Sequence, residues 1–254
     1  MATYKKRGFK KKPFSNKIGD IGQKSATANV FNTLDEGASK TEKWVAKNQK
    51  YIFGLIGLTA IVVLGYFGYF KYIKEPKEVN SMDSMFAAQR LFEQALDENN
   101  DSIYRLSING NGMKMGFLEI IDKYSGTNAS NLSNYYVGMS YLKLKDYKNS
   151  IKYLSQFNSD DQILSSLAKG SIGDCFVQLD QLEDALDYYE KAIDINTNDY
   201  TTAMYLLKAA HVSMELKKNK KSYNYFSRIK SDFPNTIFAE NIDVFISKAK
   251  ALLK

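Results

Sequence analysis

The sequence predicts an all-α protein in which a single N-terminal transmembrane helix is followed by an α-solenoid of helical hairpins. Three observations support this fold class: an uncharged apolar run at residues 51–70, helical spacing of apolar residues beyond residue 74, and a segment that recurs with a period near 35 residues. The chain has 254 residues, of which 44% are hydrophobic and 25% charged, and this excludes collagen-like and wholly disordered proteins. We predict a basic tail (1–50), the transmembrane helix (51–73), a divergent helical pair (74–130), the repeats (131–236) and a C-terminal capping helix (237–254).

Residues 51–70 read YIFGLIGLTAIVVLGYFGYF and contain no charged side chain. A helix of this length extends about 30 Å, which is the thickness of the hydrocarbon core of a bilayer. Tyrosines and phenylalanines gather at both ends of the run, between Lys50 and Lys71, as in the aromatic belts of membrane helices. A cleaved signal peptide is the competing interpretation, but the run is too long and no A-x-A-like site follows it. We therefore predict an uncleaved signal-anchor.

Charge asymmetry predicts the topology of this anchor. Residues 1–50 hold twelve lysines and arginines against four acids, a net charge of +8, whereas few cations follow the span closely. The positive-inside rule then places the N-terminus in the cytoplasm and residues 74–254 across the membrane. The chain beyond the span carries a net charge of −1, so no basic fold for specific nucleic-acid binding is predicted. For the dense basic stretch at 4–12, two roles are open: fixing topology, or contact with anionic lipid or ribosomal RNA.

Two further features surround the span. Gly54, Gly57, Gly65 and Gly68 fall on one helical face, which would let a second membrane helix approach closely, although glycine is also simply common in membrane helices. Residues 30–49 have the spacing of a short amphipathic helix before the span. After the span we expect a helix at 79–98, a loop at 99–112 because asparagines and glycines cluster there, and a second helix at 113–124.

From residue 131 onward the sequence repeats itself. Residues 135–157 (YYVGMSYLKLKDYKNSIKYLSQF) align with residues 170–192 (GSIGDCFVQLDQLEDALDYYEKA) at an offset of 35, and residues 207–229 (LKAAHVSMELKKNKKSYNYFSRI) form a weaker third copy. This pattern resembles the tetratricopeptide repeat family, with the middle copy matching best. The resemblance implies two helices per repeat, A and B, and a set of packing positions. These are Gly138, Tyr141, Leu144, Tyr147, Gly173, Phe176, Leu179, Ala185, Tyr189, Ala192, Ala210, Leu216, Phe226 and the closing Pro234.

The same resemblance implies that certain helix A positions line the inner surface of the solenoid, where a partner would bind. In this chain they are Leu132, Tyr135, Met139, Leu142, Leu167, Asp174, Val177, Met204, Leu207, His211 and Met214. The set is apolar and rich in methionine, which suits a surface that accepts varied apolar segments. The alternative is that the helix at 79–98, or an amphipathic helix at 238–253 that closes the solenoid, fills this face as ordinary core.

Enzymatic chemistry is not predicted. The chain has one cysteine, Cys175, and one histidine, His211, and no phosphate-binding loop, paired carboxylates or metal-ligand spacing stands out. We expect Cys175 to be a buried apolar residue and His211 to be a packing residue rather than a pH sensor. No catalytic, cofactor or metal residue is therefore assigned, and the chain is predicted not to be an enzyme.

The order of basic tail, membrane helix and repeats resembles the YfgM family. This resemblance implies an ancillary subunit of the bacterial Sec translocon (SecYEG) in the inner membrane, with its repeat domain in the periplasm. It also implies a PpiD-like chaperone as a partner and contact with polypeptides emerging from the translocon. A scaffold for another envelope complex, in secretion or cell division, is the alternative.

Overall fold

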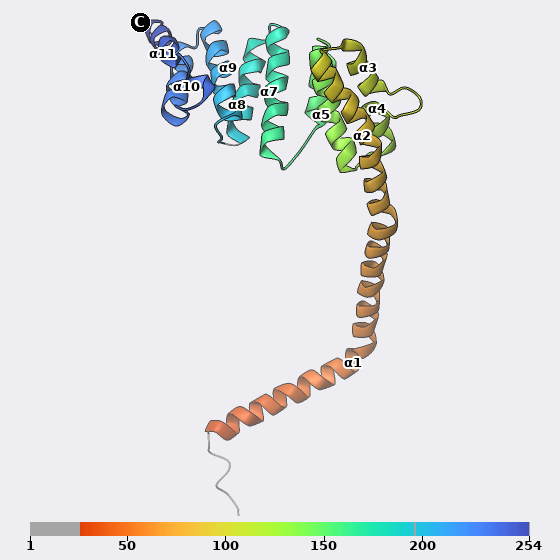
Figure 1. Ribbon diagram of the computed structural model, residues 1–254. Helices are drawn as coiled ribbons and strands as arrows, with labels where there is room; N and C mark the ends of the chain where they lie inside the picture. The colour runs from red at the N-terminus through yellow and green to blue at the C-terminus, as the bar shows by residue number, and fades with distance from the viewer. Residues whose placement is uncertain (1–25, 196, 254) are drawn as a thin grey trace, which may run out of the picture. The chain divides into compact units, whose positions relative to one another are not determined.

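The computed structural model describes residues 26–195 and 197–253, and the basic stretch at 4–12 lies outside them. Within these residues the chain is helical, apart from turns and an isolated bridge between Gly110 and Met115 (Figure 1). The chain divides into two compact units, Met1–Gly68 and Tyr69–Lys254. The all-α prediction is confirmed for the part of the chain that is described.

The first unit is dominated by a single helix, α1 (Ala26–Tyr69), which is 44 residues long. It contains both the apolar run and the predicted amphipathic stretch at 30–49, so no separate short helix precedes the run. The reason is local: no proline lies between Pro13 and Pro76, so nothing removes a backbone donor and ends the helix. The apolar side chains of 51–69 lie largely exposed. Among the described residues, this continuous helical stretch is the one long and apolar enough to cross a membrane.

The second unit begins with a π-helical turn, η1 (Phe70–Lys74), and continues as α2 (Glu75–Glu98). The predicted helix at 79–98 is thus confirmed, and it starts one turn earlier. The expectation of a loop over 99–112 is wrong, because α3 (Asp101–Asn109) forms there. Asn100 caps this helix by accepting a hydrogen bond from the backbone N of Ser102 at 2.9 Å, so it marks a helix start rather than a loop.

The next helix, α4 (Phe117–Lys123), is shorter than the predicted helix at 113–124 because Gly116 forms its N-terminal cap. The region before the repeats therefore holds three helices where two were expected. Its core is aromatic: the ring of Tyr136 stacks on Phe117 with centroids 5.0 Å apart and meets the edge of Phe92 at 5.1 Å. These contacts bring α2 and α4 onto the first repeat helix.

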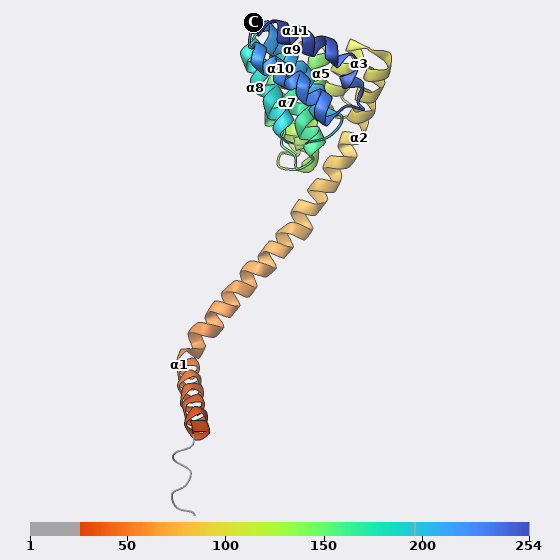
Figure 2. The ribbon, with the colours of Figure 1, turned by 90° about the vertical axis from the view of Figure 1, so that its left-hand side faces the viewer.

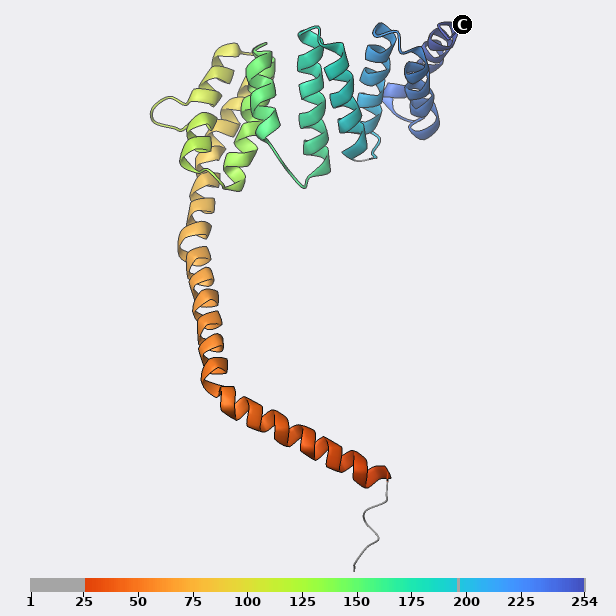
Figure 3. The same ribbon diagram turned by 180° about the vertical axis from the view of Figure 1, so that it is seen from behind.

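Three helical hairpins follow, and Figures 1 and 3 show them side by side in chain order. Each consists of a helix A and a helix B whose apolar faces are buried only where neighbouring hairpins stack, as expected for a solenoid. The six helices are α5 (Asn128–Lys143), α6 (Tyr147–Gln156), α7 (Gln162–Gln178), α8 (Leu182–Ile195), α9 (Thr201–Glu215) and α10 (Asn219–Asp232).

The turn between helix A and helix B has the same backbone in all three hairpins. Lys145, Asp180 and Lys217 each follow the end of helix A with a left-handed backbone, at φ values of 61°, 58° and 58°. L-residues adopt this conformation at a cost, and glycine is the usual residue there. The shared strain shows that the third, weaker copy in the sequence is a full structural repeat.

Helices A and B of each hairpin approach closely at a position where helix A carries glycine or alanine. A Cβ atom added to Gly138 would lie 2.5 Å from Cγ of Leu154, and one added to Gly173 would lie 2.6 Å from Cε1 of Tyr189. Ala210 occupies the matching place in the third repeat and is fully buried. The ring of Tyr141 stacks on Tyr153 and that of Phe176 packs on Tyr188, so two of the repeats use the same aromatic pair.

The C-terminal segment differs from the single helix predicted at 238–253. A 3-10 turn, η2 (Ile237–Ala239), comes first, and α11 (Ile242–Ala251) starts only after Asn241, whose φ of 57° interrupts the helix. Pro234 lies just beyond the end of α10, as the repeat pattern predicts. Viewed along the stack of hairpins, α11 lies against α9 and α10 at the end of the solenoid (Figure 2).

We call the contact between neighbouring hairpins a seam, and the buried apolar clusters in the two seams differ in size. Between α6 and α7 the buried apolar residues form a small cluster of Leu154, Phe157, Ala168 and Ile172. The second and third hairpins share a much larger cluster that continues into α11, and three ion pairs connect them. No ion pair connects the first hairpin to the second among the residues that the structure describes.

Candidate functional site

The helix A side chains predicted to line the inner surface share one environment. They lie on α5, α7 and α9 and are half-buried, so each keeps part of its surface free. Most of the apolar ones also pack on a buried core cluster. We call this surface the helix-A face. Its apolar members are Leu132, Met139, Leu142, Leu167, Val177, Met204, Leu207 and Met214.

A pocket of about 340 Å³ opens where the first and second hairpins meet. Leu142 from α5 and Val177 from α7 give it apolar walls, and Asp174 contributes a carboxylate. Tyr147 closes one side by donating a hydrogen bond from its hydroxyl to Oε1 of Gln178 at 3.3 Å. Sequence reasoning placed Leu142, Asp174 and Val177 on one surface, and the structure brings these three together.

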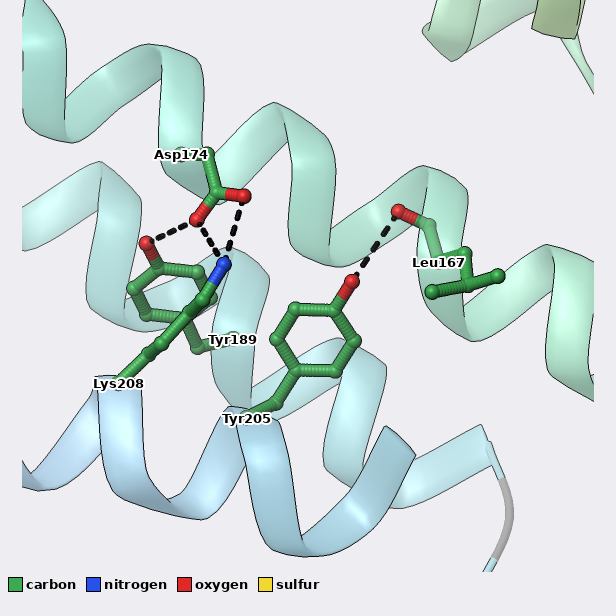
Figure 4. Close-up of polar contacts among 5 residues, drawn as sticks. All are labelled: Leu167, Asp174, Tyr189, Tyr205 and Lys208. Atoms are coloured by element: carbon green, nitrogen blue, oxygen red, sulfur yellow. Dashed lines mark hydrogen bonds and ion pairs between the residues drawn. The ribbon is translucent and has the colours of Figure 1, made fainter. Parts of the chain in front are cut away.

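Asp174 is held by Tyr189 from its own hairpin and by Lys208 from the next hairpin (Figure 4). Nζ of Lys208 donates to both of its carboxylate oxygens at 2.7 Å, and the hydroxyl of Tyr189 donates to Oδ1 at 2.7 Å. The ammonium of Lys208 also lies over the rings of Tyr189 and Tyr205, 5.9 and 5.4 Å from their centroids. This arrangement connects α7, α8 and α9 through one charged group.

Burial keeps the tyrosines of this face protonated. It raises the pKa of Tyr189 far above its usual range, and the charge of Asp174 and the hydrogen bond to it raise the pKa further. Burial likewise raises the pKa of Tyr205, whose hydroxyl donates to the backbone O of Leu167 at 3.4 Å. The pKa of Tyr135, which packs on Phe157, rises to about 12 for the same reason. These residues are hydrogen-bond donors and packing groups, and none is poised to act as a base.

The uncompensated charge at the pocket is positive. Lys143 and Lys145 line it and form no ion pair with any residue that the structure describes, whereas Asp174 is already paired with Lys208. A partner segment at this pocket therefore meets an apolar surface bordered by two free cations.

His211 lies in a packing environment, as expected from the sequence, although it was also assigned to the candidate binding surface. Its ring lies between Phe226 and Phe245, edge to face, with centroids 5.3 and 5.1 Å away. Phe245 belongs to α11, so the C-terminal helix covers this end of the helix-A face, as the alternative interpretation of the sequence proposed. Burial lowers the pKa of His211, with opposing contributions from Glu215, which raises it, and Lys248, which lowers it. The helix-A face is open at the first two hairpins and partly covered at the third.

Cys175 is buried, and burial raises the pKa of its thiol to about 11. No group of three or more potential metal-ligating side chains occurs in the described part of the chain. Gly54, Gly57, Gly65 and Gly68 in α1 have no neighbouring atoms within 4 Å where a Cβ would project, so a second helix at this face stays a prediction.

Sequence reasoning missed Lys208 and Gly170. A Cβ on Gly170 would lie 1.9 Å from the ring of Tyr205, so a glycine here permits a close contact between the second and third hairpins. One signal was present for Lys208: it follows Asp174 by 34 residues, which is one repeat length, and equivalent positions of neighbouring repeats lie side by side in a solenoid.

Comparison with known proteins finds one tetratricopeptide repeat in the second hairpin. Residues 168–199 match the tetratricopeptide repeat family, and they cover most of α7 and all of α8. The crystal structure of the MamA protein is similar with a TM-score of 0.48 and 15% sequence identity, over 67% of this chain and 88% of that one. No curated protein matches the chain. With one matched repeat and three stacked hairpins, the second unit is an α-solenoid of the tetratricopeptide type, the architecture of a protein-interaction scaffold.

Proposed function

We propose that this protein is a single-pass membrane adaptor whose helix-A face binds an apolar polypeptide segment of a partner protein. The supporting observation is a row of half-exposed apolar side chains on α5 and α7 at the 340 Å³ pocket. Apolar side chains that remain half-exposed on successive helices leave apolar surface in contact with water, and a partner could bury it. A bound segment would complete the burial of Leu142 and Val177. Flexible methionines such as Met139 suit partners of varied sequence.

The anchor in this proposal is the apolar part of α1. Its side chains are exposed to solvent in the isolated chain, and a stretch of this length and composition is stable when surrounded by lipid. The charge bias then orients the chain with the N-terminus in the cytoplasm and residues 74–254 in the periplasm of a bacterial inner membrane. A protease added to intact spheroplasts should then remove the repeat domain, and a repeat domain left intact would contradict this topology.

The specific partner we propose is the Sec translocon, SecYEG, with a PpiD-like chaperone beside it. The order of basic tail, span and repeats supports this assignment, since it resembles the YfgM family. In this role the helix-A face would hold or transfer polypeptides as they leave the translocon. The second candidate is a scaffold for another envelope complex in secretion or cell division, which the same adaptor architecture also suits.

Site-specific photo-crosslinking in native membranes tests the adaptor and its partner together. A photoreactive residue at Leu142 or Val177 should capture translocon subunits, the chaperone or nascent polypeptide. Lys152 on α6 is the matched control, because it is exposed and lies outside the pocket. Capture of another envelope complex would favour the second candidate. Equal products from Leu142 and Lys152, or capture of this chain alone, would contradict a binding role for the helix-A face.

A further inference from the structure

A second apolar surface lies outside the repeats, where α2 meets the loop between α3 and α4. We call it the Met113 patch, and it comprises Phe86, Arg90, Leu91, Met113 and Lys114. Met113 is 90% exposed and Phe86 is 61% exposed, and between them lies a cavity of about 650 Å³. Two large apolar side chains held in water beside one cavity are unusual for an isolated surface.

The loop that presents Met113 is well ordered by its own hydrogen bonds. Oδ1 of Asn111 accepts from the backbone N of Met113 at 3.1 Å and of Lys114 at 2.8 Å. At the base of the loop, a Cβ on Gly116 would lie 2.2 Å from the backbone N of Gly110, so only glycine fits there. The sequence thus specifies a fixed loop with Met113 at its tip. Packing within the chain does not explain the position of Met113, because its side chain is 90% exposed and touches little of the rest of the chain.

The charge of the patch indicates what it binds. Arg90 and Lys114 line the cavity, no carboxylate lines it, and neither cation forms an ion pair with a residue that the structure describes. Glu93 is the nearest acid to Arg90 along α2, followed by Asp83 and Asp97 at seven residues, and none of the three forms an ion pair with it. The patch is therefore apolar with a net positive border.

Two other occupants fit less well. In a symmetric dimer the patch would meet itself, so Arg90 and Lys114 would face like charges with no acid between them. A bilayer surface would have to reach Phe86, which lies eleven residues, or about 16 Å of helix, beyond the start of α2 at Glu75.

We infer that the Met113 patch is a docking surface for an acidic amphipathic segment of another protein, with apolar side chains against Phe86 and Met113 and carboxylates at Arg90 and Lys114. This surface is separate from the helix-A face. The adaptor would then hold two different protein segments at once, an apolar one on the repeats and an acidic amphipathic one on α2.

A local fluorescence assay tests this inference on the full chain in phosphatidylcholine nanodiscs. An environment-sensitive dye is attached at Met113→Cys; the native thiol of Cys175 does not compete, because it is buried and its pKa is raised to about 11. Two synthetic amphipathic helices serve as probes: one carries leucines on one face and glutamates on the other, and its twin has lysine for every glutamate. We expect the glutamate peptide to bind about fivefold more tightly than its twin.

Charge reversal sharpens the test. In the R90E/K114E variant the preference should reverse, so that the lysine peptide binds more tightly. The control K148E/K220E changes two exposed lysines outside the patch and should keep the original preference. Phe86→Ser should weaken binding of the glutamate peptide about tenfold, and because the side chain is exposed the fold is retained.

Four outcomes would overturn the inference. They are equal binding of the two peptides, an unchanged preference in R90E/K114E, a dye response to phosphatidylglycerol vesicles without any peptide preference, and a response that grows with protein concentration as the particle mass doubles. The third would identify a lipid surface and the fourth a second copy of this chain. None of them bears on the helix-A face, because the dye at position 113 reports only on this loop.

Discussion

The two ends of the helix-A face differ in what covers them. At the first two hairpins Leu142 and Val177 line an open pocket, whereas at the third hairpin His211 lies beneath Phe245 of α11. The same hairpin repeated thus produces a binding surface at one end and a core at the other. The difference is that Phe245 of α11 packs on His211 at the third hairpin, whereas Leu142 and Val177 line a pocket that is still open. A solenoid must end, and α11 occupies the place where the next helix A would stack.

The largest expected effect on stability comes from truncating the residue at the centre of the contact between the third hairpin and α11. Phe226 is fully buried and contacts both His211 and Phe245. Phe226→Ala should lower the free energy of unfolding by about 3–5 kcal/mol, through lost burial and the cavity left behind. Urea denaturation of the full chain in detergent measures this loss. Phe86→Ala is the control: its side chain is exposed, so a comparable loss there would contradict the distinction between a covered and an uncovered surface.

The next effect concerns the charged group at the border between the two ends. Asp174→Ala leaves Lys208 without its carboxylate and should cost about 1 kcal/mol, since both side chains are about one-third exposed and solvent weakens the pair. A double-mutant cycle with Lys208→Ala measures the coupling directly. Asp187→Ala removes an exposed pair with Lys191 on one helix and should cost at most about 0.5 kcal/mol. Equal costs at the two sites would contradict a connecting role for Asp174.

Smaller gains in stability are expected from substitutions in the turn between helix A and helix B of the first and third hairpins. Lys145 and Lys217 occupy left-handed backbone, so replacing either by glycine should raise the free energy of unfolding by about 0.5–1 kcal/mol. Lys143 is the last residue of α5, and its replacement by glycine should lower the free energy by a similar amount. Thermal denaturation of the three variants compares them. A loss at Lys145 or Lys217 would show that their side chains matter more than the backbone strain.

The smallest effect is a pH dependence confined to the covered end. Burial makes the pKa of His211 lower in the folded chain than its ordinary value of 6.5, so the unfolded chain binds the proton more readily. The stability from a neutral His211 is complete above pH 6.5 and is lost as the pH falls from there toward the folded-state pKa. His211 is the one histidine in the chain, so His211→Phe should remove this dependence. Denaturation midpoints that fall equally between pH 7 and 5.5 in both proteins would contradict the prediction.

Periodicity gave the helices of the repeats, because each hairpin must bury the same kind of face. The resemblance to the tetratricopeptide repeat family placed Leu142, Asp174 and Val177 on one surface. Periodicity could not foresee α3, because Asn100 and Gly110 have the composition of a loop and act here as helix boundaries. Periodicity also could not predict which other side chains an individual residue contacts. Whether α11 or solvent covers His211 depends on how a turn at 237–241 returns the chain, and no local pattern fixes this.

The small seam between α6 and α7 has a mechanical consequence. The second and third hairpins share three ion pairs and one large buried core. The first and second share a smaller buried cluster around Leu154 and Phe157 and the hydrogen bond from Tyr147 to Gln178. The pocket lies across this contact, because Leu142 belongs to the first hairpin and Val177 to the second. A force that separates the first hairpin from the second would therefore divide the pocket walls while the core shared by the second and third hairpins stays intact.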